Sequence, residues 1–130
     1  MKLRILVLAT LVLPTAGCQT WGPTWSELSG RRYSTGEIYQ YRRPAIIEQV
    51  DGQGSFAQYP IKLEPGVHQI TIQGPTRRAG GGFLKTLSID MAPCRIYYVN
   101  AQFKNNIEPE YEPVIDYVDS IAGCTVPVKK

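Results

Sequence analysis

The segment from Val67 to Gln73 most constrains the fold, because its residues alternate between a more apolar and a more polar face. His68, Ile70 and Ile72 fall on one face of the segment. This period of two is typical of a half-buried antiparallel strand. Glu64-Pro65-Gly66, just before it, has proline and glycine where a tight turn takes them. No amphipathic helical pattern longer than two turns occurs in the sequence, so the chain is predicted to be all-β.

Further segments show strand patterns separated by turn residues. Asp51-Gly52 is a strong tight-turn dipeptide, and Pro60 marks an edge or a bulge because proline has no ladder donor. Together with 67–73 they make six or seven short strands, which predicts a small antiparallel β-sandwich or barrel, and we expect the sandwich. The other expected strands are 45–50, 55–63, 83–91, 94–103 and 114–121.

The N-terminus has the order of an export signal. Lys2 and Arg4 precede an apolar stretch, Ile5 to Leu13, which small residues and Cys18 follow. The stretch is too short to cross a hydrocarbon core, which needs about 20 apolar residues.

Ala16-Gly17-Cys18 resembles a bacterial lipobox, with Thr15 departing from its usual aliphatic residue. The resemblance implies cleavage before a Cys18 that carries acyl chains such as palmitate. We expect a signal peptide (1–17), a lipidated cysteine and tether (18–43), and a β-sandwich domain (44–130). The alternative is an ordinary secreted protein with a free Cys18.

The predicted tether lacks sustained periodicity and is rich in glycine, serine, threonine and arginine. Thr24 and Glu27 stand at capping-box spacing, which allows one helical turn around Trp25–Leu28. Trp21 and Trp25 fit two interpretations equally: indole rings at a membrane interface, or rings packed on the domain.

Cysteine arithmetic supports an oxidising compartment. With Cys18 lipidated, Cys94 and Cys124 remain as a pair. We expect them to form a disulfide that closes a loop of about 30 residues and contributes about 3.5 kcal/mol. A zinc or redox site is the weaker interpretation, because the sequence has no CxxC and one histidine.

The charge balance argues against nucleic acid as a partner. The signal peptide holds two of the 14 basic residues and none of the 11 acidic ones, so the remaining chain carries 12 against 11. A nearly neutral domain has no general affinity for polyanions.

No set of residues predicts catalysis, a metal site or a cofactor. His68, the sole histidine, shares the apolar face of its strand, which is more typical of a core or rim residue than of a general base. Glu108, Glu110 and Glu112 could collect calcium oxygens but fit an exposed acidic loop better. The loop that contains Arg77, Arg78, Gly80, Gly81 and Gly82 is a candidate contact with a partner. The alternative interpretation is a flexible connection between two strands of a hairpin.

The run from Ile61 to Ile72 resembles the L-x-PG-x-H-x-I-x-I hairpin of PEGA-like and related small β-sandwich lipoproteins. Cys94 to Ala101 is similar to their G-x-x-Y-x-V-x-A strand, with cysteine where glycine is usual. Tyr111 to Asp116 looks like their closing strand. The resemblance covers about residues 44–120. It implies an envelope lipoprotein with no catalytic residue to carry over, in which His68 serves the hairpin.

These observations predict a non-enzymatic binding or accessory subunit of an envelope assembly, with a protein partner. Gln19 after the lipidated cysteine implies retention at the outer membrane, facing the periplasm. The alternative function is inhibition of a wall-degrading, lysozyme-type hydrolase through a protruding loop. A third hypothesis, hydrolysis by His68 with a carboxylate, requires a solvent-facing imidazole in a pocket.

Overall fold

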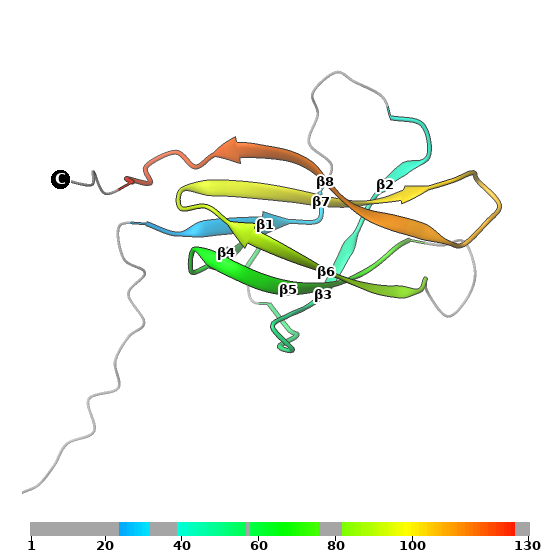
Figure 1. Cartoon of the computed structure of the whole chain (residues 1–130), viewed down its shortest axis with the longest axis horizontal. Coiled ribbons are helices and arrows are strands. Elements are labelled where there is room, and N and C mark those ends of the chain that lie inside the picture. The colour runs from blue at the N-terminus through cyan, green and yellow to red at the C-terminus, as the bar shows by residue number, and fades with distance from the viewer. Residues whose placement is uncertain (1–23, 32–38, 57, 76–81, 127–130) are drawn as a thin grey trace, which may run out of the picture.

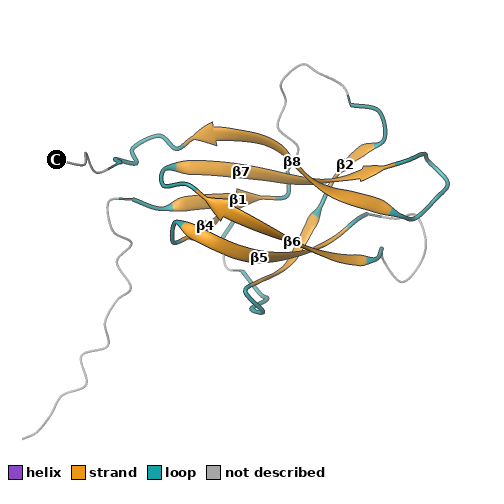
Figure 2. Ribbon diagram, in the orientation of Figure 1, coloured by secondary structure: helices purple, strands orange, loops and turns teal. Residues whose placement is uncertain are grey.

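The computed structural model describes residues 24–31, 39–56, 58–75 and 82–126. Across these residues the chain is all-β, as predicted, with two packed sheets of five and three strands and no helix (Figures 1 and 2). The strands are β1 (Ser26–Ser29), β2 (Arg42–Pro44), β3 (Ile46–Val50), β4 (Ile61–Leu63), β5 (Gly66–Gln73), β6 (Leu84–Met91), β7 (Arg95–Phe103) and β8 (Tyr111–Ser120).

The larger sheet is built around β7. One edge of β7 pairs with β8 along its whole length, and the other edge is shared by β1 and β2. The pairing of β1 with β7 is parallel, and β4 continues the sheet by an antiparallel pairing with β1. β7 has paired neighbours along both edges, and Tyr97, Val99, Ala101 and Phe103 on one of its faces belong to the hydrophobic core.

The smaller sheet has the order β3-β5-β6, and both of its pairings are antiparallel. The chain passes from the larger sheet to the smaller one at Ala45, between β2 and β3. The alternation that the sequence predicts for β5 is confirmed: Ile70 and Ile72 are fully buried, and Val67 is 66% exposed.

The core lies between the two sheets. Leu28, Ile70, Ile72 and Val99 are each 0% exposed and come from strands of both layers. Burying an aliphatic side chain of this size stabilises the fold by about 1.5–3 kcal/mol relative to leaving it in water. The core therefore fixes which faces of β1, β5 and β7 meet.

The sandwich begins earlier than the sequence predicted. β1 and β2 lie within the segment assigned to the tether, and β1 is an interior strand between β7 and β4. The helical turn expected around Trp25–Leu28 is wrong. Four residues with one aliphatic core side chain, Leu28, give too short a pattern to recognise, and pairing with two neighbours decides the conformation.

Two other boundaries differ. The strand expected over 55–63 is confined to Ile61–Leu63, after the loop that contains Pro60. β8 starts at Tyr111, three residues before the strand expected over 114–121, and includes Pro113. β8 pairs only with β7, and an edge strand accommodates proline on its unpaired side.

Candidate functional site

The disulfide marks one end of the sandwich. Cys94 and Cys124 are bonded, as predicted, with their Cα atoms 5.4 Å apart. The backbone N–H of Cys94 donates to Trp25 O at 2.8 Å, just ahead of β1. The disulfide therefore lies beside the start of β1, and we call this end the proximal pole (Figure 1).

Trp25 packs on the domain at the proximal pole. Its Nε1–H donates to Glu27 Oε1 at 2.8 Å, and Lys62 Nζ lies 4.7 Å from the centre of the ring. Of the two interpretations open for this side chain, the structure supports packing. Trp21 lies outside the described residues.

The opposite end carries the turns that follow β5 and β7, and we call it the distal pole. The paired residues Gln73 and Leu84 end the β5–β6 hairpin there. The paired residues Phe103 and Tyr111 end the β7–β8 hairpin at the same pole (Figure 2).

One tyrosine fastens the two hairpins to each other. The Tyr111 hydroxyl lies 2.6 Å from Phe83 O, to which it donates, and 3.0 Å from Ile72 O. Gly74 makes room for its ring, because a Cβ at this position would lie 2.7 Å from the ring carbons. Burial raises the pKa of Tyr111, so the hydroxyl stays a donor at physiological pH.

Exposed apolar side chains gather at the distal pole. Phe83, Leu84 and Ile107 are 54%, 61% and 87% exposed. Phe83 and Leu84 lead into β6, and Ile107 lies in the β7–β8 loop. Large exposed apolar side chains at one end of a domain are typical of a protein contact. The sequence analysis did not single these residues out, since exposure depends on which loops share a pole.

The predicted contact loop joins β5 to β6 at this pole. Of its residues, Gly82 is described, and its carbonyl accepts a hydrogen bond from Gln73 Nε2 at 3.1 Å. The other residues of that prediction, Arg77, Arg78, Gly80 and Gly81, lie outside the described residues, as does the lipid-attachment residue Cys18.

Glu108 and Glu110 of the β7–β8 loop and Glu112 of β8 line one pocket, together with the cation Lys104. Glu108, Glu110 and Glu112 are exposed, and Glu112 pairs with Lys85 at 3.6 Å. Within the described ranges no three histidine, cysteine or acidic side chains lie close enough to hold a metal ion. The arrangement fits an exposed acidic loop better than a calcium site.

His68 holds a turn together. Its Nδ1 lies 2.6 Å from Asp51 Oδ2, and its Nε2 lies 2.7 Å from Glu64 O. Both partners are acceptors, so the geometry suits an imidazole with both ring nitrogens protonated. The other carboxylate oxygen, Asp51 Oδ1, accepts the Gln69 N–H at 2.8 Å. We call this group of contacts the His68–Asp51 clasp.

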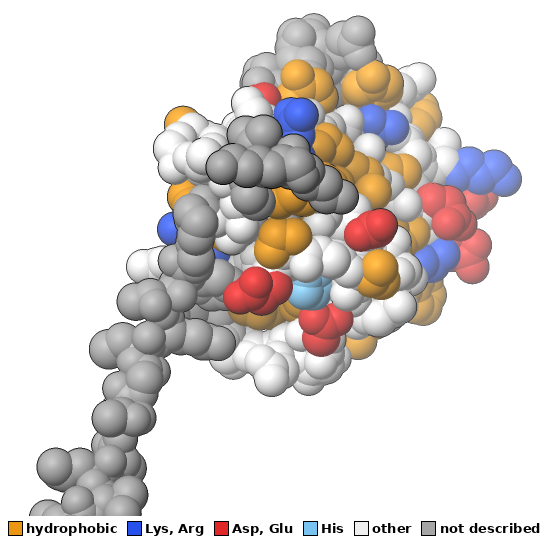
Figure 3. Space-filling model, turned by 60° about the vertical axis from the view of Figure 1, so that its left-hand side comes forward, with side chains coloured by type: hydrophobic (Ala, Val, Ile, Leu, Met, Phe, Trp, Pro, Cys, Tyr) orange, Lys and Arg blue, Asp and Glu red, His pale blue; other side chains and the backbone are white. Residues whose placement is uncertain are grey.

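The clasp shifts the pKa values of both residues. Burial alone would lower the pKa of His68, but its hydrogen bonds to Asp51 and Glu64 outweigh that cost and raise it. The Gln69 amide, followed by His68, lowers the pKa of Asp51. The His68 side chain is 12% exposed, and Figure 3 shows the imidazole beside acidic side chains. An imidazole with both nitrogens engaged has no lone pair with which to accept a proton.

No family model, curated protein or solved structure matches this chain. Among the residues that the structure describes, none forms a helix long and apolar enough to span a membrane. The arrangement of the two poles is therefore the main structural guide to function.

Proposed function

We propose that this chain is a lipid-anchored, non-enzymatic envelope lipoprotein that binds a protein partner at its distal pole. Acyl chains on Cys18 would hold it at the outer membrane, facing the periplasm. Two or more acyl chains give stable anchoring. The lipobox-like run before Cys18 supports the anchor.

The observation that carries the proposal is the opposition of the two poles. β1 begins at the proximal pole, eight residues after Cys18. Phe83, Leu84 and Ile107 lie at the distal pole. β5 spans eight residues between the poles, or about 26 Å at about 3.3 Å per residue. A domain of this shape, anchored at its proximal pole, would present Phe83, Leu84 and Ile107 away from the bilayer.

A binding role rather than catalysis is supported by the state of His68. Both of its nitrogens donate to Asp51 and Glu64, and this arrangement stabilises a turn. General-base catalysis needs a free nitrogen within reach of a substrate.

The proposal is tested with a photoreactive amino acid placed at Ile107 or Leu84 of the full chain in its native envelope. Val67 is the matched control, because it is equally apolar and 66% exposed but lies at the proximal end of β5. Illumination should give one cross-linked species of defined mass from the distal positions and none from Val67. The Cys18→Ser form should give less of that species, because the protein would no longer be held near its partner.

Equal cross-linking from distal positions and Val67, or none from any position, would reject the distal contact. Mass spectrometry of the cross-linked species identifies the partner. If the partner is a structural envelope protein, the chain is an accessory subunit. If the partner is a lysozyme-type hydrolase, the function is inhibition of that enzyme.

A further inference from the structure

A cavity of about 420 Å³ opens where β1 ends. β1 pairs with β7 as far as Tyr98, and β2 begins its pairing with β7 at Asn100. Val99 between them has no partner on this edge, and the chain leaves β2 for the smaller sheet. The cavity lies in the resulting notch, and its volume falls within the roughly 300–1,000 Å³ of small-molecule sites.

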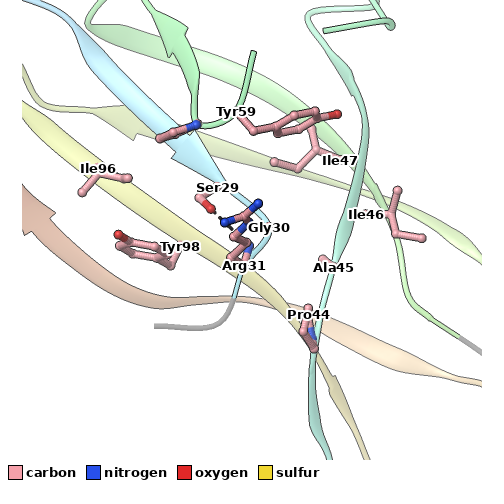
Figure 4. A pocket seen from close by; sticks show the side chains of 11 residues that line it. Ser29, Gly30, Arg31, Pro44, Ala45, Ile46, Ile47, Tyr59, Ile96 and Tyr98 are labelled. Atoms are coloured by element: carbon pink, nitrogen blue, oxygen red, sulfur yellow. Dashed lines mark hydrogen bonds between the residues drawn. The ribbon is translucent and has the colours of Figure 1, made fainter. Parts of the chain in front are cut away.

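The walls of the cavity are apolar. Ile46 and Ile47 of β3 line one side, and Ile96 and Tyr98 of β7 line the other. Figure 4 shows these two groups with the Arg31 side chain between them. Ile46 and Tyr59, which also lines the cavity, are 51% and 59% exposed, so the apolar lining reaches the surface. Such walls favour an aliphatic chain.

The polar part of the lining comes from the end of β1 and the residues just after it. Among the described residues that line it, Arg31 is the only charged one. Its backbone N–H donates to Ser29 Oγ at 3.1 Å, which leaves the hydroxyl proton of Ser29 free to donate in turn. Within the described residues no hydrogen bond or ion pair engages the Arg31 guanidinium. A guanidinium and a hydroxyl side by side suit a carboxylate, which accepts both.

The wall formed by Ile96 and Tyr98 limits the charge of an occupant. Glu27 and Asp119 are the register partners of Ile96 on its two sides. Burial, then Asp119 and Glu27, raise the pKa of Tyr98 on the same wall. Glu27 precedes Arg31 by four residues, or about 13 Å of extended chain. A second negative charge is therefore disfavoured, and a bound anion is directed to the Arg31 end.

We propose that this cavity binds a single-chain aliphatic monocarboxylate, with its carboxylate on Arg31 and Ser29 and its chain between Ile96 and Ile46. This site is separate from the distal pole and does not depend on the proposed partner. A free fatty acid and a lipid breakdown product both supply this chemistry.

The test uses the full chain in lipid nanodiscs and decanoate with a photoreactive diazirine at the chain end. Mass spectrometry of the digested protein should place the label on β3 and β7, at Ile46–Ile47 and Ile96–Tyr98. Unlabelled decanoate should compete. Decanol, which lacks the charge, and decyl phosphate, which can carry a second one, should compete more weakly.

Arg31→Gln should weaken the competition by decanoate about tenfold, the loss expected for one charge-assisted hydrogen-bonded contact. Arg31→Lys should restore part of it, and Ile46→Trp, at an exposed position, should block labelling by filling the mouth. Arg95→Gln is the matched control, because Arg95 is exposed on β7 and does not line the cavity.

Label spread evenly over the domain, or equal competition by decanol, would show partition into apolar surface and overturn the proposal. The proposal would also be overturned if Arg31→Gln and Arg95→Gln proteins bound decanoate equally well. Stronger competition by decyl phosphate than by decanoate would overturn the assignment of a monocarboxylate.

Discussion

Arg42 and Asp116 form an ion pair across β7, with Arg42 Nη1 2.5 Å from Asp116 Oδ1. Arg42 lies on β2 and Asp116 on β8, the strands on the two opposite edges of β7. Asp116 stands at a bulge in β8, between Ile115, which pairs with Val99, and Tyr117, which pairs with Tyr98. The bulge brings the Asp116 side chain over the central strand β7. The pair therefore joins three strands of the larger sheet.

The same carboxylate serves a buried amide. Asn100 is 0% exposed, and its Nδ2 donates to Asp116 Oδ2 at 3.0 Å. Arg42 Nε also donates to Gln102 Oε1 at 3.0 Å, and its guanidinium lies 3.9 Å from the centre of the Tyr39 ring. Loss of Asp116 would leave Arg42 Nη1 and Asn100 Nδ2 without this acceptor.

Asp116→Ala should lower the free energy of unfolding by about 3–5 kcal/mol, the usual cost of removing one member of a buried ion pair. Asp90→Ala is the control, since Asp90 is exposed on β6, and should change it by less than about 0.5 kcal/mol. Urea unfolding gives both values. Equal effects of the two substitutions would contradict the assigned role of Asp116.

The strands that the sequence predicts best are those whose pattern is local. β5 could be located because His68, Ile70 and Ile72 alternate beside a tight turn, but its pairing could not: β4, across that turn, pairs with β1 in the other sheet. β1 could not, because Leu28 is one core residue in a four-residue strand whose partners lie far along the chain.

Sites assembled from several strands were equally beyond prediction. Arg42, Asn100 and Asp116 meet only through the shared edges of β7 and the bulge in β8. The notch beside Arg31 likewise depends on where β1 and β2 stop pairing with β7. The disulfide was predictable because counting cysteines needs no topology.

The Cys94→Ala/Cys124→Ala double variant should be less stable by about 3.5 kcal/mol, from the loop-closure entropy of about 30 residues. Reduction should lower the unfolding free energy of the parent protein to that of the variant and leave the variant unchanged. Urea unfolding with and without reductant makes the measurement. A parent protein indifferent to reduction would contradict a stabilising disulfide.

Gly30→Ala should destabilise the protein severely, because a Cβ at residue 30 would lie 2.1 Å from Ala45 O. Gly52→Ala is the matched control. It has a φ of +79° and nothing within 4 Å of the added Cβ, so it should cost only the roughly 1–2 kcal/mol of a left-handed conformation. Thermal unfolding ranks the two variants. A Gly30→Ala protein as stable as Gly52→Ala would mean that β1 and the crossover at Ala45 do not approach closely.

The His68–Asp51 clasp should make stability depend on pH. The pKa of His68 is raised above 6.5 in the folded state, so its contribution is full below pH 6.5 and is lost as the pH rises through the folded value. The pKa of Asp51 is lowered below 3.8, so its contribution is full above pH 3.8 and is lost as the pH falls through the folded value. The clasp should therefore stabilise the domain most between pH 3.8 and pH 6.5.

Urea unfolding should be measured from below pH 3.8 to well above pH 6.5. The parent protein should lose free energy of unfolding as the pH rises above 6.5, and His68→Gln should lose less. Asp51→Asn, which removes the carboxylate charge, should bring the pKa of His68 down toward its ordinary value in an NMR titration. If parent and His68→Gln proteins change alike with pH, the imidazole is not held as a cation by its two acceptors.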